Sequence, residues 1–202
     1  MPEKEYEELK KDLLKILRNM SSLIDLRNGY EMNHSQEVAK YAVLIAKEMG
    51  LSDEEIEDIN YAALLHDIGK LEIKEGILTK PDAFSDMDWK ILADYPKKGA
   101  EAISNVDILK KCEPLILYHR QWYKDGMESY PTKVEGEDIP LGARIISVAE
   151  AYQAMISARP YRKALPKELV ISEMKKRAGI QFCPKVIDAF LKVIEKEEKG
   201  GL

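Results

Sequence analysis

The stretch Ala62–Lys70, which reads AALLHDIGK, joins four apolar residues directly to a histidine and an aspartate. A buried carboxylate is costly unless it is paired, hydrogen-bonded or bound to a cation. Asp67 therefore needs a partner if the apolar run before it is buried. Ser52 and Glu55 form a capping-box pattern, which predicts that a helix begins there and runs to about Asp67. The pair His66-Asp67 is thus expected at the end of a buried helix.

Apolar residues recur at helical spacing along most of the chain, and we find no convincing alternating, strand-like run. The sequence therefore predicts an all-α fold. The expected helices, with shorter ones begun by Ser85 and Pro96, cover about residues 3–26, 34–49, 52–67, 106–118, 141–157, 166–178 and 184–198. We expect an N-terminal helical extension over residues 1–27, one domain over 28–198 and a frayed tail over 199–202.

Charge and composition exclude several classes of protein. The 202 residues carry 31 Lys+Arg against 36 Asp+Glu, a formal net charge of −5, whereas domains that bind duplex nucleic acid usually show a basic surface. Two cysteines are too few for a disulfide framework or a Cys-rich zinc site. No apolar run approaches the ~20 residues of a membrane helix, and the charged start does not resemble a signal peptide. We expect a cytoplasmic protein that binds neither duplex nucleic acid nor a membrane.

The three histidines of the chain, His34, His66 and His119, each extend an apolar helical stripe. One such histidine is most often a hydrogen-bonded core residue, but three favour convergence on a common site. Glu150 shares this placement because it follows the mostly apolar segment 143–149. Imidazoles combined with carboxylates suit zinc, iron and manganese. We therefore expect a metal site assembled from several helices.

Three motifs in order give the sequence a family resemblance. Ala62–Lys70 resembles the defining motif of the HD metal-dependent phosphohydrolase superfamily, His34-Ser35 resembles its upstream histidine motif, and Ala143–Glu150 is similar to its last acidic-ligand helix. Further segments resemble the HD-GYP branch, namely 77–81, 125–126, 130–131, 136–140, 159–162 and 179–182. The resemblance covers roughly residues 28–190.

The resemblance implies an HD-domain-like helical bundle that hydrolyses a small phosphoester or cyclic dinucleotide, most specifically the bacterial messenger cyclic di-GMP. The implied cofactor is a divalent metal ion, with iron or manganese favoured and zinc possible. The implied metal ligands are His34, His66, Asp67, His119 and Glu150. The implied catalytic residues are Asp67, which can orient the attacking water, and Lys70. The implied substrate contacts, which are solvated charges or loop residues in the alternative interpretation, are Lys70, Tyr130, Arg159 and Arg162.

The sequence also departs from the branch pattern. Glu150 replaces the usual aspartate, and Tyr30 stands where some members carry a glutamate. Tyr95 occupies the place of a histidine, and Tyr118 and Arg120 replace two residues of a His-His-Glu segment. A tyrosine hydroxyl is a poor ligand at neutral pH because its pKa is ~10. Two alternatives therefore stay open: a non-catalytic module that binds a nucleotide or a protein, and a structural helical module with a vestigial site.

The expected N-terminal helix has an apolar stripe that needs cover. Its members are Leu9, Leu13, Ile16, Leu17, Met20, Leu23 and Ile24. The stripe can pack against the chain's own domain, or it can pair with a second copy and form a homodimer. The sequence leaves both arrangements open.

Overall fold

The computed structural model of the chain describes residues 3–30, 33–78, 80, 85–124, 134–158 and 163–201. These residues are helical and contain no β-strand, which confirms the predicted all-α fold. The α-helices are α1 (Glu3–Arg27), α2 (His34–Glu48), α3 (Asp53–Leu65), α4 (Glu75–Leu78), α5 (Asp86–Ala93), α6 (Tyr95–Ile103), α7 (Glu113–Tyr118), α8 (Leu141–Ile156), α9 (Lys167–Lys176) and α10 (Pro184–Glu198). Short 3₁₀-helices occur at η1 (Ile68–Glu72), η2 (Asp107–Cys112) and η3 (Gly136–Asp138).

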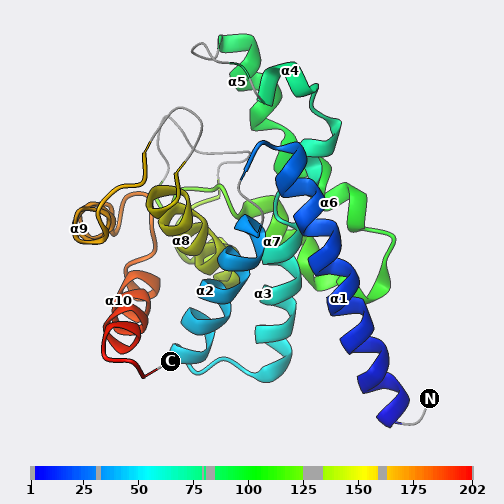
Figure 1. Cartoon of the computed structure of the whole chain (residues 1–202), viewed down its shortest axis with the longest axis horizontal. Helices are drawn as coiled ribbons and strands as arrows, with labels where there is room; N and C mark the ends of the chain where they lie inside the picture. The colour runs from blue at the N-terminus through cyan, green and yellow to red at the C-terminus, as the bar shows by residue number, and fades with distance from the viewer. Residues whose placement is uncertain are drawn as a thin grey trace.

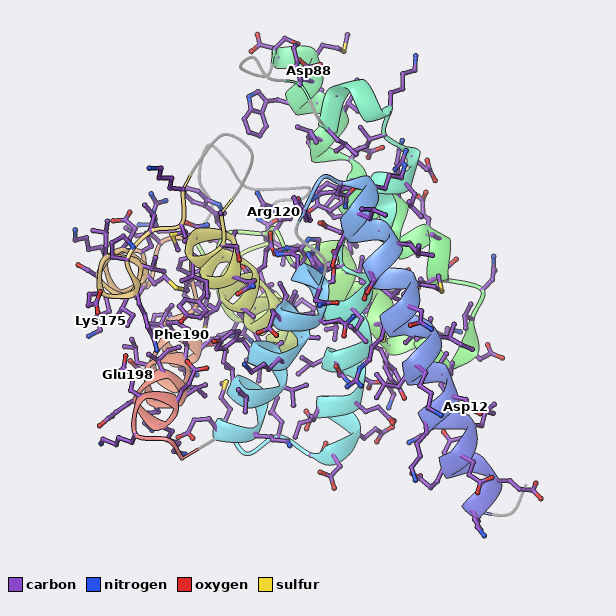
Figure 2. The ribbon with its side chains drawn as sticks, viewed as in Figure 1. Asp12, Asp88, Arg120, Lys175, Phe190 and Glu198 are labelled. Carbon is purple, nitrogen blue, oxygen red and sulfur yellow. The ribbon has the colours of Figure 1, made fainter. Side chains whose placement is uncertain are left out.

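Helices α2, α3 and α8 form the centre of the bundle (Figure 1). Helix α1 runs along the outside against α2 and α3, and α9 and α10 cover the opposite flank. Figure 2 shows Phe190 on the inner side of α10, where its ring packs 4.9 Å from the ring of Tyr152 on α8. No helix in the described segments combines the length and the apolar character needed to span a membrane.

Two helix starts follow the capping patterns in the sequence. The Ser52 hydroxyl accepts from the Glu55 backbone N–H, and the Glu55 carboxylate accepts from the Ser52 N–H, so α3 begins at a complete capping box. Ser85 and Asp88 make the same reciprocal pair at the start of α5. These local bonds satisfy N–H groups that a helix start leaves without partners.

The single helix predicted over residues 106–118 is wrong. The chain instead forms the 3₁₀-helix η2 and then the α-helix α7, with Pro114 in the first turn of α7. A proline lacks the N–H for a helical hydrogen bond and its ring clashes with the preceding turn, so it is tolerated only near a helix start. The apolar spacing continues across this break, which is why periodicity alone does not reveal it.

Backbone packs against backbone where η1 meets α6. A Cβ atom on Gly69 would lie 2.0 Å from the carbonyl oxygen of Tyr95 and 2.5 Å from the nitrogen of Gly99. Only a glycine permits this approach. The contact fixes the segment that follows His66 and Asp67 against the start of α6, and so it places Tyr95 beside the histidines.

Candidate metal centre

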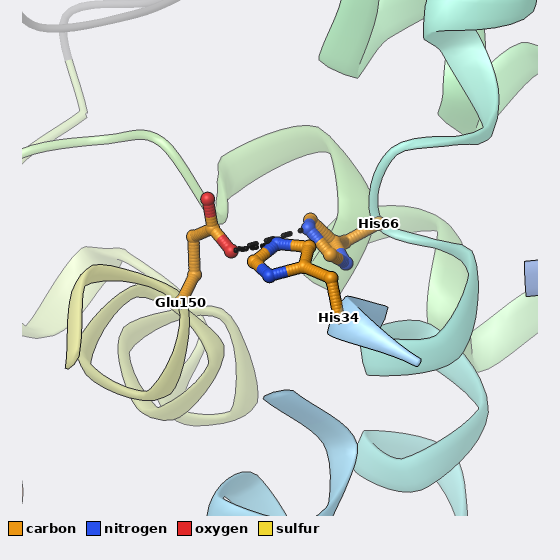
Figure 3. Close-up of side chains that lie close together, drawn as sticks. All are labelled: His34, His66 and Glu150. Carbon is orange, nitrogen blue, oxygen red and sulfur yellow. Dashed lines mark ion pairs between the residues drawn. The ribbon is translucent and has the colours of Figure 1, made fainter. Parts of the chain in front are cut away.

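Three separate helical segments bring their side chains to one buried point. His34 is the first residue of α2, His66 ends α3, and Glu150 lies in α8. The Nε2 atom of His34 lies 2.9 Å from Glu150 Oε2, and the Nε2 atom of His66 lies 3.5 Å from the same oxygen (Figure 3). Asp67 adds its Oδ1 atom, which is 3.6 Å from His66 Nε2. The convergence expected from the sequence is therefore present for His34, His66 and Glu150, whose ligand atoms all lie within 4.8 Å of one another, and Asp67 adjoins this group through His66.

These four atoms fit a cation because they are buried and make ion pairs within the cluster but no hydrogen bond to a described residue. The side chains of His34, His66, Asp67 and Glu150 are at most 9% exposed. His34 Nε2, His66 Nε2, Asp67 Oδ1 and Glu150 Oε2 are all buried without a hydrogen-bond partner among the described residues. Burying an unsatisfied polar atom costs about 1–3 kcal/mol, and more for a charged group. Two imidazole nitrogens with two carboxylate oxygens form a donor set suited to a divalent transition metal.

Backbone carbonyls set the orientation of two histidine rings. His66 Nδ1 lies 2.7 Å from the carbonyl oxygen of Ala63, and His119 Nδ1 lies 2.6 Å from that of Ile116. A carbonyl only accepts, so Nδ1 donates in both rings and Nε2 carries the lone pair of the neutral form. Metal-binding histidines are commonly held in this way. In the neutral form of His66, Nε2 therefore faces Glu150 as an electron-pair donor.

His119 joins the histidine cluster but has a different environment. Its ring centroid lies 5.3 Å from that of His66, as the convergence of all three histidines predicted. Its Nε2 accepts a hydrogen bond of 2.9 Å from the hydroxyl of Tyr95. Burial, together with the neighbouring His66, lowers the pKa of His119 to about 3, and burial raises the pKa of Tyr95 well above its usual value. Both groups are therefore neutral at pH 7, and a metal could use this nitrogen only by displacing Tyr95.

Lys70 holds one oxygen of Asp67 and leaves the other free. Its Nζ donates to Asp67 Oδ2 and to the hydroxyl of Tyr30, each at 2.7 Å. Burial disfavours the charged ammonium, but Asp67 outweighs it and raises the pKa of Lys70 well above its usual value. Burial likewise favours the neutral acid at Asp67, yet Lys70 and His66 keep its pKa below the usual range. Asp67 is therefore an anion whose Oδ1 atom faces the site.

The charges of His66 and Glu150 depend on which of their atoms carry a proton. Burial opposes the imidazolium of His66, but Asp67 and Glu150 outweigh burial and raise the pKa of His66 to about 9. Burial also opposes the carboxylate of Glu150, but His34 and His66 hold its pKa well below the usual range. Without a metal, the proton on His66 compensates the negative charges of Asp67 and Glu150. A cation bound between these side chains would replace that proton.

Three of the expected substrate contacts, Tyr130, Arg159 and Arg162, lie outside the described residues. The structure adds one residue that the sequence analysis missed. The carboxylate of Asp25 is fully buried and accepts two hydrogen bonds from Ser35. The available signal was a carboxylate directly after Ile24 in an apolar stripe, which is the same kind of signal that identified Glu150.

Comparisons with known proteins agree with this geometry. A protein-family model described as an HD domain matches residues 18–186. The chain is 34% identical over 196 residues to a cyclic di-GMP phosphodiesterase of Thermotoga maritima, covering 96% of the chain and 51% of that protein. It is 33% identical over 178 residues to the cyclic di-GMP phosphodiesterase response regulator RpfG of Xanthomonas campestris, covering 87% of the chain and 47% of that protein. The chain thus spans about half the length of these relatives.

A solved structure has the same arrangement of helices. It is a cyclic GMP-AMP specific phosphodiesterase of Vibrio cholerae, which superposes with a TM-score of 0.72 at 17% sequence identity. The likeness covers 92% of the present chain and 49% of that one. At this identity the likeness concerns the fold alone, and the helical bundle is therefore shared.

Proposed function

The chain belongs to the HD domain family, and from this premise we propose that it is a metal-dependent phosphodiesterase that acts on a cyclic dinucleotide. The observation that carries the proposal is the cluster of four buried atoms at His34, His66, Asp67 and Glu150 that have no hydrogen-bond partner among the described residues. Such a cluster is costly unless a cation completes it. The names of the related proteins supply the substrate class, and cyclic di-GMP is the first substrate to test.

We propose that these four residues hold one divalent ion, with iron or manganese favoured over zinc. A bound ion of this kind supplies an activated water and polarises a phosphoryl oxygen. His66 is held by the Ala63 carbonyl and Asp67 by Lys70, so two of the four ligands are oriented by neighbours. Such orientation by neighbouring groups raises metal affinity in known metal sites.

We propose that Lys70 acts on the substrate as well as on Asp67. Its ammonium is charged, lies beside the proposed metal ligand Asp67, and is held by the hydroxyl of Tyr30. An ammonium at this place can neutralise a phosphate oxygen in the transition state. Tyr130, Arg159 and Arg162 remain proposed substrate contacts, and they complete the phosphate-binding part of the hypothesis.

The hydrolysis of cyclic di-GMP by metal-loaded protein tests the proposed function. Addition of one water across one P–O bond converts the cyclic substrate into a linear dinucleotide, which chromatography separates. We expect turnover in the wild type and none in Glu150→Ala. The control is Tyr41→Phe, which removes one hydroxyl that binds Glu197 and should leave turnover unchanged. A folded, metal-loaded wild type that leaves cyclic di-GMP and 3′3′-cGAMP intact would contradict the proposal.

The hydrogen bond between Tyr95 and His119 favours a second candidate function. It satisfies a nitrogen that would otherwise be free to bind an ion, so the site has fewer available ligands than the sequence pattern implies. A non-catalytic module that binds a nucleotide is consistent with this loss. Calorimetry with cyclic di-GMP distinguishes the two candidates, because the second predicts saturable binding and an unchanged nucleotide after prolonged incubation with metal.

We also propose that the chain forms a homodimer through the outer face of α1. Leu9, Ile16 and Leu23 are exposed there and follow one another at seven-residue spacing, which is typical of paired helices. Half of the exposed large hydrophobic side chains in the described segments belong to α1. A second copy is the proposed partner because an identical stripe matches this spacing. The cytoplasmic location and the absence of duplex nucleic acid among the partners stay predictions.

A further inference from the structure

Helix α2, which begins with His34, takes its cap from another helix. Its own capping residue, Asn33, has a left-handed φ of 79° and makes no side-chain cap within the described part of the chain. The cap comes instead from α1, where Asp25 Oδ2 accepts from the Ser35 backbone N–H at 2.9 Å and Oδ1 accepts from the Ser35 hydroxyl at 2.5 Å. A helix start leaves N–H groups without partners and favours a negative charge. The buried carboxylate of Asp25 therefore fixes the turn that carries His34.

The same turn of α1 also holds the segment that follows His66 and Asp67. The guanidinium of Arg27 donates from Nη1 to the carbonyl oxygen of Lys70 and from Nη2 to that of Ile73, each at 2.8 Å. These carbonyls lie within and just beyond η1, where a helix end needs donors. The planar fork of an arginine fixes two acceptors in one geometry, which a lysine cannot do.

We propose that Asp25 and Arg27 are positioning residues that set the separation between His34 and the His66-Asp67 segment. This inference rests on the proposed metal centre. The two residues lie two positions apart on α1. Asp25 binds the segment that carries His34, and Arg27 binds the segment that follows His66 and Asp67. They act through the backbone, because Asp25 binds Ser35 and Arg27 binds carbonyl oxygens. The last turn of α1 thereby tunes the metal affinity of a site to which it contributes no ligand.

We call the contacts of Asp25 with Ser35 and of Arg27 with Lys70 and Ile73 the α1 brace. The metal affinity should be sensitive to this brace because the ligands must keep a fixed spacing. Transition-metal bonds to imidazole and carboxylate are about 2.0–2.2 Å long, so small displacements of one ligand matter. His34 is the first residue of its helix, and helix ends fray readily, so capping bonds help to hold it in place. Loss of groups that orient metal ligands typically costs about 10–100-fold in metal affinity.

Competition titration of Mn²⁺ against a chelating dye tests the brace with three variants of the full chain. Asp25→Ala removes both bonds to Ser35, and we expect its dissociation constant to rise about 10–100-fold. Asp25→Asn keeps an oxygen that accepts from the Ser35 N–H, and we expect it to restore most of the affinity. Leu17→Ala is the matched control, because Leu17 is buried in α1 and its loss destabilises the chain without removing a hydrogen bond. Its affinity should equal that of the wild type.

Hydrogen exchange of the metal-free proteins supplies a readout that does not depend on the proposed function. Asp25→Ala should accelerate amide exchange in the first turn of α2, whereas Leu17→Ala should not do so selectively. If wild-type protein binds no metal, the proposed function fails, and selective exchange alone then decides whether the brace exists. The brace is overturned if α2 exchanges at the same rate in both variants, or if folded Asp25→Ala binds Mn²⁺ as tightly as the wild type.

Discussion

At the scale of single residues, Asp67 divides its carboxylate between two tasks. Oδ2 is bonded to the ammonium of Lys70, and Oδ1 lies 3.6 Å from His66 Nε2 and makes no hydrogen bond to a described residue. Both side chains are nearly inaccessible to solvent, so their charges depend on each other. A buried charge that loses its partner is strongly destabilising. Lys70 therefore supports the site even before a substrate is present.

Replacement of Lys70 tests this dependence. We expect Lys70→Met to lower the free energy of unfolding of the metal-free protein by about 3–5 kcal/mol, because the buried Asp67 loses the cation that is hydrogen-bonded to it. Added Mn²⁺ should recover part of the loss. The control is Lys111→Met, which breaks the exposed ion pair with Glu54 and should cost at most about 1 kcal/mol. Urea unfolding with equal losses in the two variants would show that Asp67 does not need Lys70.

The raised pKa of His66 predicts how metal binding depends on pH. Its imidazole titrates at about 9 in the metal-free protein, and a metal binds only the deprotonated ring. Below this pKa the ion must displace a proton, so the apparent affinity should rise about tenfold per pH unit and level off above it. Dye competition across this range measures the slope. An affinity that does not change between neutral pH and the plateau would contradict a ligand role for His66.

At the scale of elements, the position of the His66-Asp67 segment depends on the close packing of η1 on α6. Gly69→Ala would place a methyl group against the backbone of Tyr95 and Gly99. We expect a loss of about 1–3 kcal/mol or more in unfolding free energy, as in other overpacked sites. Gly76→Ala in α4 is the matched control, since no described atom lies within 4 Å of the added carbon. Thermal unfolding should show a lower Tm for Gly69→Ala alone.

Local signals in the sequence predicted much of the element order and most of the site. The capping box at Ser52, the apolar run before His66 and the buried position of Glu150 were all readable within one or two helical turns. Pro114 marked the break between η2 and α7, but the apolar period that crosses it favoured one long helix.

The contacts of the brace and the hydrogen bond from Tyr95 to His119 could not be predicted from local sequence signals. Arg27 meets Lys70 across 43 residues of sequence, and Tyr95 meets His119 across 24. Such contacts depend on how complete helices pack, so a residue's own segment does not reveal its partner. The sequence predicts that residues 1–27 form an extension outside the domain, which gives no reason to expect Asp25 beside the site. That division of the chain stays a prediction.

At the scale of the whole molecule, α1 has two faces with different tasks. Its inner face carries Asp25 and contacts α2, α3 and η1. Its outer face exposes apolar side chains. Helix α1 runs along one side of the bundle, and its N-terminal end lies at the edge of the described structure (Figure 1). Figure 2 shows Asp12 on the N-terminal half of this helix. A partner bound to the outer face would therefore contact the same helix whose Asp25 and Arg27 bind the segments that carry His34 and His66.

Self-association through this face is testable by light scattering coupled to size-exclusion chromatography. We expect wild-type protein to dimerise with rising concentration and Ile16→Glu to stay monomeric, because a charge then replaces an apolar side chain that is 55% exposed in the single chain. The control is Leu169→Glu, since Leu169 is similarly exposed on α9 and should not affect dimers. A wild type that stays monomeric at high concentration contradicts the proposed dimer.

The metal content of the purified protein tests the central claim most directly. Elemental analysis should be made on wild type and His66→Ala, both purified without chelator. The account predicts close to one iron, manganese or zinc ion per wild-type chain and a near-complete loss in the variant. If both proteins remain free of metal after reconstitution with each of these ions, the four buried atoms do not form a metal centre and the proposed chemistry is contradicted.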